Sequence, residues 1–252
     1  NQLYPYQIEA HKKIIDEFNT NQSLLLQMPT GTGKTEVFCS IIREFRKRYE
    51  TKRIIVLVHR NYLVDQIQTR LIKKFKMPVG VVKADEAFSL EWQVHICSKD
   101  TLLNRNYDLG YPSLIVIDEA HHSAADTYQK LIKRFKNDET KFLGVTATPM
   151  RMDGKLLSGI FQKLIVSDPI SSFIRSGYLS KLKYYAIDRL DRSKMKVDSK
   201  SHDYLEEDAY QFMHNDRIMA EITTAYTRYA NEKKAIVFCV NLKHASEVKE
   251  RF

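Results

Sequence analysis

The sequence predicts an α/β fold built around a parallel sheet, and two observations support that prediction. Short runs rich in β-branched residues recur through the first 150 residues, and most of them precede a loop and a segment of helical period. That alternation is typical of parallel strands joined by helical crossovers. The runs are SLLLQ (23–27), RIIVLVH (53–59), QVHICS (93–98), SLIVID (113–118) and FLGVTAT (142–148).

The composition is that of an ordinary globular protein. The 252 residues, 43% hydrophobic and 28% charged, allow one large domain or two smaller ones. No apolar run reaches the ~18 residues of a membrane span, and the start NQLYPYQIEA has no signal-peptide pattern. We therefore expect a soluble intracellular protein, cytoplasmic if its source is prokaryotic or viral. Cys39, Cys97 and Cys239 lie far apart in apolar runs, so we expect reduced core thiols.

Positive charge is concentrated in one part of the chain. The formal net charge is +9, and residues 41–76 hold eleven Lys or Arg against three acids. A basic surface of this kind commonly meets nucleic acid phosphates. Two solvated faces of amphipathic helices would give the same composition. Charge alone leaves both interpretations open.

The stretch LLLQMPTGTGKTEVFCSII (24–42) predicts a phosphate-binding loop between a strand and a helix. In such a loop several backbone N–H groups point inward, and the positive end of the helix dipole faces the anion. Lys34 would reach the outer phosphates, and the Thr35 hydroxyl would hold Mg²⁺. Gly31 and Gly33 would allow the tight backbone path. The alternative is a Gly-rich turn that only caps the helix.

Two further features belong to the same loop. Thr30 and Thr32 complete the sequence TGTGKT, so we count them among the nucleotide-binding residues. Met28 stands where the general G-x-x-x-x-G-K-[ST] pattern has its first glycine.

The stretch SLIVIDEAHH ends an apolar strand with two adjacent carboxylates. In a nucleotide hydrolase, Asp118 would bind Mg²⁺ and Glu119 would orient and polarise the attacking water, while His121 could connect this site to the next motif. The alternative is a strand followed by a helix that Asp118 caps. A zinc site is disfavoured because His121 and His122 are expected to point apart and no third ligand stands at useful spacing.

Together the elements MPTGTGKT, DEAH and TATP resemble motifs I, II and III of superfamily 2 helicases and translocases. The opening LYPYQIEA resembles the adenine-reading Q-motif of the branch that includes type I and type III restriction motor subunits and DNA repair helicases. That resemblance implies that Gln7 pairs with the adenine edge of ATP. Tyr4 stands where the pattern usually has Arg.

The same resemblance implies further site residues. VLVHRNYLVDQ (56–66) resembles motif Ia and ICSKDTLL (96–103) resembles the Thr-containing element after it, which makes Arg60, Asn61 and Thr101 candidate nucleic acid contacts. Thr146 and Thr148 would couple the γ-phosphate site to the nucleic acid face.

The resemblance also implies a domain organisation. Residues 1–178 would form a P-loop RecA-like domain, and residues 179–252 the start of a second one. KLKYYAID (181–188) would be its first strand, and KAIVFCVNLKHASEVKERF (234–252) resembles motif IV. The later Q-x-x-G-R-x-x-R motif, which carries arginine fingers, is absent from the sequence. We therefore expect a truncated motor with low activity.

The predicted function is an ATP-dependent helicase or translocase that uses ATP and Mg²⁺ and acts on nucleic acid, with DNA favoured over RNA. Three alternatives remain. They are the motor subunit of a restriction enzyme, an RNA helicase or RNA-dependent ATPase, and a module that binds ATP without hydrolysing it. Glu119 argues against the last, because a structural site does not need a water-activating acid.

Overall fold

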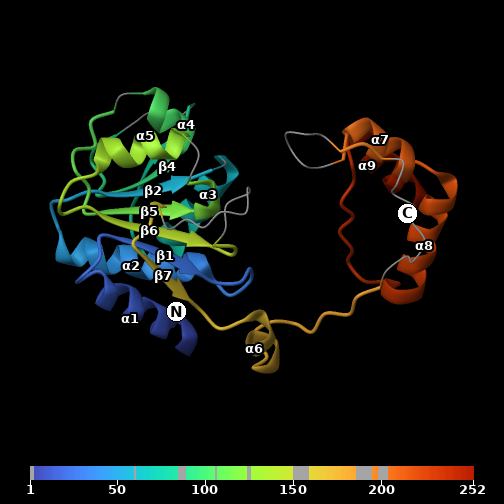
Figure 1. Ribbon diagram of the computed structural model, residues 1–252, viewed down its shortest axis with the longest axis horizontal. Helices are drawn as coiled ribbons and strands as arrows, with labels where there is room; N and C mark the ends of the chain where they lie inside the picture. The colour runs from blue at the N-terminus through green and yellow to red at the C-terminus, as the bar shows by residue number, and fades with distance from the viewer. Residues whose placement is uncertain are drawn as a thin grey trace. The chain divides into compact units, whose positions relative to one another are not determined.

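The computed structural model describes residues 3–59, 61–84, 89–105, 107–123, 126–149, 159–185, 195–197 and 204–252 (Figure 1). Only the backbone is described for Asn61 and Asp126. The chain divides into two compact units, one that extends to Leu182 and one that begins at Lys183. Among the helices that the structure describes, none combines the length and the apolar character needed to span a lipid bilayer.

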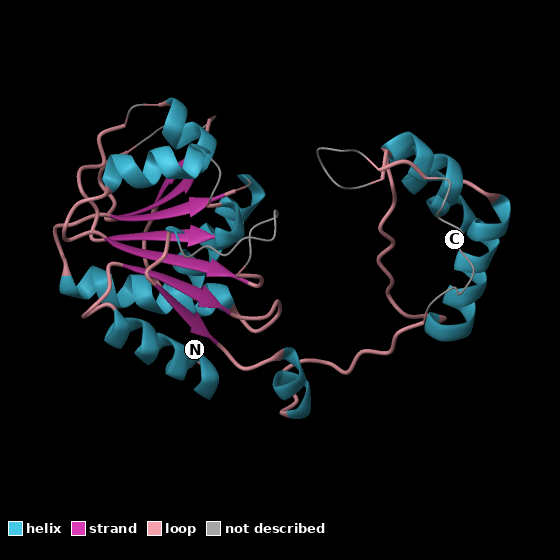
Figure 2. Cartoon of the chain, in the orientation of Figure 1, coloured by secondary structure: helices cyan, strands magenta, loops and turns pink. Residues whose placement is uncertain are grey.

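The first unit contains a seven-stranded parallel sheet in the order β3-β4-β2-β5-β6-β1-β7. All strands point the same way, so their carboxyl ends share one edge (Figure 2). The five predicted strands are present, whereas β3 and β7 were not predicted. The bounds are β1 (Ser23–Gln27), β2 (Ile54–Val58), β3 (Gly80–Val82), β4 (Val94–Ser98), β5 (Leu114–Asp118), β6 (Lys141–Thr146) and β7 (Lys163–Val166).

Helices cover both faces of this sheet (Figure 1). Along β5, Leu114 and Val116 join a core with α1, α2 and α3, whereas Ile115 and Ile117 join a second core with α4 and α5. This alternation follows from the two-residue period of a strand. Both faces are therefore apolar, as expected of a buried parallel sheet. The helices are α1 (Pro5–Glu17), α2 (Lys34–Arg48), α3 (Asn61–Lys73), α4 (Lys99–Asn104), α5 (Asp126–Phe135) and α6 (Ile170–Arg175), with a 3₁₀ turn, η1 (Ala120–His122).

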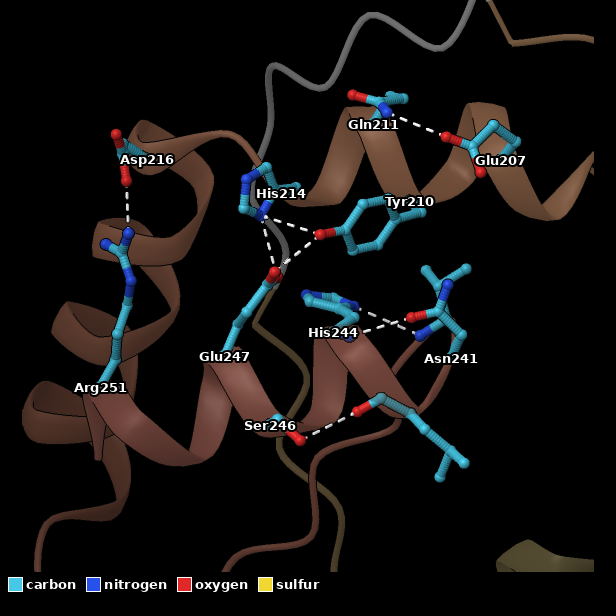
Figure 3. Close-up of polar contacts among 12 residues, drawn as sticks. Glu207, Tyr210, Gln211, His214, Asp216, Asn241, His244, Ser246, Glu247 and Arg251 are labelled. Carbon is cyan, nitrogen blue, oxygen red and sulfur yellow. Dashed lines mark hydrogen bonds and ion pairs between the residues drawn. The ribbon is translucent and has the colours of Figure 1, made fainter.

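In the second unit, the described residues form three helices, α7 (Glu206–Met213), α8 (Asp216–Ala230) and α9 (Leu242–Arg251). Polar side chains join α7 to α9 (Figure 3). The Tyr210 hydroxyl donates to Glu247 Oε1 at 2.7 Å, and His214 Nδ1 lies 2.8 Å from Glu247 Oε2. An ion pair between Arg251 and Asp216 links α9 to α8.

The strand expected at residues 181–188 is not formed in the residues described. Residues 181–185 and 234–240 have no strand assignment, and residues 186–188 lie outside the described residues. Apolar side chains in both segments face solvent, with Tyr184 89% and Phe238 93% exposed. The family resemblance implied the strand at residues 181–188, but a strand is stable only when a neighbour accepts its backbone hydrogen bonds.

Candidate active site

The loop between β1 and α2 has the backbone that its glycines predicted. Gly31 and Gly33 adopt left-handed conformations with φ of 85° and 81°, which disfavour any side chain. The Met28 N–H donates to the Thr146 carbonyl at 3.0 Å, so the end of β6 holds the start of the loop. Inside the loop, the buried Thr32 hydroxyl donates to the Pro29 carbonyl at 2.6 Å. Thr30 is exposed.

Two side chains from α1 brace this loop. Gln7 is 3% exposed, and its Nε2 donates to the Thr32 carbonyl at 3.0 Å. The Tyr6 hydroxyl donates to the same carbonyl at 3.0 Å. A Cβ at Gly33 would lie 2.5 Å from Gln7 Nε2, so the amide approaches the loop where only glycine fits. The adenine contact of Gln7 stays a prediction, and its loop contact is new.

Sequence reasoning also missed residues that follow β7. Tyr178 packs edge-on against the Tyr6 ring with centroids 4.8 Å apart, and Phe173 does so at 4.9 Å. The side chain of Leu179 lies 3.1 Å from the position that a Cβ on Gly31 would take. These contacts join residues far apart in sequence, and periodicity carries no signal for them.

Lys34 begins α2 and is partly buried beside Asp118, the last residue of β5, and Glu119, which follows it. Burial lowers the pKa of Lys34, and the negative charges of Glu119 and Asp118 oppose that effect. Its ammonium group donates to the Met28 carbonyl at 3.4 Å. The lysine therefore lies within the loop, near both acids.

Asp118 is a buried carboxylate, 8% exposed, at the end of β5. Burial raises the pKa of Asp118 to about 6, the neighbouring Glu119 charge adds to this, and a hydrogen bond from the Glu119 N–H and the Lys34 charge oppose it. Thr35 and Asp118 line the same cleft. The Thr35 hydroxyl and the Asp118 carboxylate are hard oxygen ligands of the kind that Mg²⁺ prefers. Burial disfavours the charged form of Asp118, and a bound cation would offset that cost. These residues therefore fit the ion.

Glu119 has a left-handed backbone, with φ of 50° and ψ of 53°. That conformation is uncommon for a residue with a side chain and is often found at functional sites. A helix capped by Asp118 does not form, because η1 follows and α5 begins only at Asp126. The alternative structural interpretation of this stretch is therefore wrong.

His121 connects Glu119 to the end of β6. His121 Nδ1 lies 3.4 Å from Glu119 Oε2 and 3.2 Å from the hydroxyl of the fully buried Thr146. That hydroxyl also donates to the Thr148 carbonyl at 2.8 Å and accepts from the Thr148 N–H at 3.1 Å. The structure thus brings four predicted site residues together. The rings of His121 and His122 do not point apart, because their centroids lie 4.1 Å apart.

One of the predicted nucleic acid contacts lies at a cleft of about 570 Å³ at the ends of β2 and β4. Thr101 lines it, together with His59 and the exposed Tyr62. Arg60 lies outside the described residues, and Asn61 begins α3 with only its backbone described.

The basic segment 41–76 does not form one free surface. Arg70 of α3 and Lys74, which directly follows α3, both pair with Glu36 in the first turn of α2, at 3.2 and 2.5 Å. Lys52 pairs with Glu139. Part of the positive charge in this segment therefore forms ion pairs between helices or lies on solvated faces.

The fold and the site together define a RecA-like P-loop domain of the superfamily 2 helicase class. The residues that define it are the loop at Lys34, the Asp118–Glu119 pair and their link to Thr146. The chain belongs to the family of the type III restriction enzyme res subunit, whose model matches residues 1–151.

Known proteins agree with this assignment. The chain is 29% identical to a "51.5 kDa protein" of Lactococcus phage (isolate 7-9), over 90% of the chain and 45% of the relative. It is 29% identical to the "Putative ATP-dependent helicase IRC3" of Saccharomyces cerevisiae, over 99% of this chain and 39% of that protein. The chain thus spans less than half the length of these relatives.

A solved structure shows the same fold. It is a nuclease-deletion mutant of the Type ISP restriction-modification enzyme LlaGI in complex with a DNA substrate mimic. The TM-score is 0.59 at 16% identity, with 92% of this chain and 25% of that chain covered.

Proposed function

We propose that the protein is an ATP-dependent nucleic acid translocase or helicase that acts on DNA in preference to RNA. One observation carries the proposal: the loop lysine, the two carboxylates at the end of β5 and just after it, and the His121–Thr146 link meet at one edge of the sheet. A site that only stored ATP would not need an acid beside the lysine.

Each residue has a defined task in this proposal. The loop N–H groups and Lys34 bind and orient the triphosphate of ATP. Thr35 and Asp118 hold Mg²⁺, which when bound neutralises charge on the phosphate oxygens. Glu119 accepts the proton of the attacking water, because its side chain is 39% exposed and projects from a backbone fixed beside Asp118. Gln7 fixes the loop and reads the adenine.

Coupling to movement follows from His121 and the threonines. Thr146 would respond to the state of the γ-phosphate through His121, and Thr148 would pass that state towards the nucleic acid face. A second RecA-like domain, which we propose begins in residues 179–252, would close on the first when ATP binds and open after hydrolysis.

Preference for DNA is supported by two comparisons. The family is described as a restriction enzyme subunit, and the LlaGI structure holds a DNA substrate mimic. The family description also favours a second candidate, the motor of a restriction enzyme. Cleavage of long DNA by the full-length protein would support that candidate, whereas ATP-driven unwinding or translocation without cleavage would support a simple motor.

The test of the main proposal is the rate of ATP hydrolysis by the full-length protein with single-stranded DNA, duplex DNA or RNA of equal length. We expect DNA to stimulate hydrolysis more than RNA does. Equal rates with and without every nucleic acid would refute the proposal. Because this sequence contains no Q-x-x-G-R-x-x-R pattern, we propose that its 252 residues alone bind ATP but hydrolyse it slowly.

A further inference from the structure

Three imidazole rings form a row at the carboxyl edge of the sheet. His59 directly follows β2, and His121 and His122 lie in η1 after β5. The ring centroids of His59 and His122 are 4.3 Å apart with planes inclined by 22°, and those of His121 and His122 are 4.1 Å apart. Because β2 and β5 are parallel neighbours, the row crosses from one strand end to the next.

The two ends of this row reach two different sites. His59 lines the cleft that contains Thr101 and Tyr62. At the other end, His121 Nδ1 lies 3.2 Å from Thr146 Oγ1 and 3.4 Å from Glu119 Oε2. The histidine row, residues 59, 122 and 121, is therefore a continuous path of contacts between the cleft and the proposed catalytic carboxylate.

We infer that His59 and His122 are positioning residues that couple occupancy of the cleft by a nucleic acid strand to the orientation of Glu119. The inference rests on the proposed function, because that function places the strand in the cleft. Stacked rings at these separations are in van der Waals contact, and imidazole is a rigid plate. A strand pressed against His59 therefore displaces His122 and, through it, His121.

Displacement of His121 reaches the chemistry directly. Its Nδ1 contacts both Glu119 Oε2 and Thr146 Oγ1, so a small rotation of the ring changes which of these two oxygens lies closer. The Glu119 backbone is held in its left-handed conformation beside Asp118, so only the side chain is free to reorient. The row thereby controls whether the Glu119 carboxylate faces the attacking water.

The row is not needed to hold the fold together. All three rings are half-buried, whereas the strand ends beneath them are fixed by β2–β5 pairing and by the two cores. Replacing one ring removes ring contacts and leaves backbone pairing in place. We therefore expect alanine variants of His59 and His122 to fold.

The first experiment measures ATP hydrolysis by the full-length protein with and without single-stranded DNA. His59→Ala and His122→Ala should lower the stimulation by DNA about five- to tenfold. In His122→Ala, whose ring is outside the lining of the cleft, the basal rate and ATP affinity should change by less than about twofold. His122→Phe keeps an aromatic plate and should retain the stimulation. His11→Ala is the matched control, because His11 is a half-buried histidine outside the row that contacts Ser40.

Two results of this experiment would overturn the inference. One is wild-type stimulation in both alanine variants. The other is a His122→Phe variant as defective as His122→Ala, because ring contact would then not be what transmits the signal.

A second experiment separates failure of the row from failure of the proposed function. Imidazole NMR signals of the 252-residue chain are recorded as Mg²⁺ and a non-hydrolysable ATP analogue are added. The His59 signal should shift, and the shift should vanish in His122→Ala. If no nucleic acid stimulates the wild type but His59 responds through His122, the proposed function fails and the row stands. If DNA stimulates the wild type but His59 does not respond, the row fails and the function stands.

Discussion

The buried carboxylate at the end of β5 should make Asp118→Asn more stable than the wild type when no metal is present. The pKa of Asp118 rises from its ordinary 3.8 to about 6 in the folded chain. A difference of about two pKa units corresponds to about 3 kcal/mol of unfavourable free energy for the charged form. Asparagine has the same shape, keeps an acceptor for the Glu119 N–H and carries no charge. Because Lys34 loses a neighbouring carboxylate, we expect a net gain of about 1–3 kcal/mol at neutral pH.

The pH dependence has a definite sign. Between about pH 4 and pH 6 the folded wild type binds more protons at Asp118 than the unfolded chain does, so its free energy of unfolding falls as the pH rises. The advantage of Asp118→Asn should therefore be small near pH 4 and complete above pH 7. Its affinity for Mg²⁺·ATP should be lost at every pH.

Urea unfolding in EDTA measures the effect, and the fluorescence of Trp92 reports it. Trp92 is the one tryptophan of the sequence and lies in the first unit. Glu119→Gln is the comparison variant: its side chain is 39% exposed, and it removes only the Glu119 contribution to the raised Asp118 pKa, so its gain should be smaller than that of Asp118→Asn. An Asp118→Asn variant no more stable than the wild type at neutral pH, or a gain that does not change with pH, would refute this reasoning.

Four further predictions concern the loop, the chemistry and the nucleic acid. Lys34→Ala should weaken binding of a fluorescent ATP analogue and abolish hydrolysis, and unchanged affinity with unchanged turnover would reject its role. Glu119→Gln should bind ATP but hydrolyse it on the order of a hundredfold more slowly, so a variant with half the wild-type rate would show that another group is the base. Gly33→Ala, forced to keep φ of 81°, should lower the free energy of unfolding by roughly 1–2 kcal/mol and weaken ATP binding, while Gly159→Ala, with open space around its Cβ position, should do neither. The logarithm of DNA affinity should fall linearly with the logarithm of the salt concentration, and Arg60→Ala should make that slope shallower by about one. Affinity that does not vary with salt concentration would mean that the basic segment is only a solvated face.

Local patterns predicted the central strands and the chemical residues well. The apolar runs of β1, β2, β4, β5 and β6 are long enough to identify them as strands. The phosphate-binding loop directly follows β1, and the two carboxylates stand at the end of β5 and just after it. β3 has only three residues, and β7 lies at the sheet edge with two exposed apolar side chains, Leu164 and Val166. Neither segment therefore shows a hydrophobic period from which a strand could be predicted.

Other features depend on contacts between distant residues and could not be predicted locally. The bonds of Gln7 and Tyr6 to Thr32 cross about 25 residues, and no spacing rule indicates them. His121 and His122 were expected to diverge, but the 3₁₀ turn brings their rings together. The strand expected at residues 181–188 had suitable side chains, but the described part of the chain gives it no neighbouring strand.

The position of β1 in the sheet sets an order of events during synthesis. Within the described part of the chain, β1 pairs with β6 and β7, so Ser23 meets its partner Phe142 about 120 residues later. At about 5–20 residues per second, the ribosome needs roughly 6–24 s to cover that distance. During this time residues 24–27 (LLLQ) lack the strands β6 and β7 that they pair with, and the Met28 N–H lacks the Thr146 carbonyl that fixes the nucleotide loop. A nascent chain that stops before residue 146 therefore exposes an apolar strand to chaperones and to aggregation, and ATP cannot rescue it.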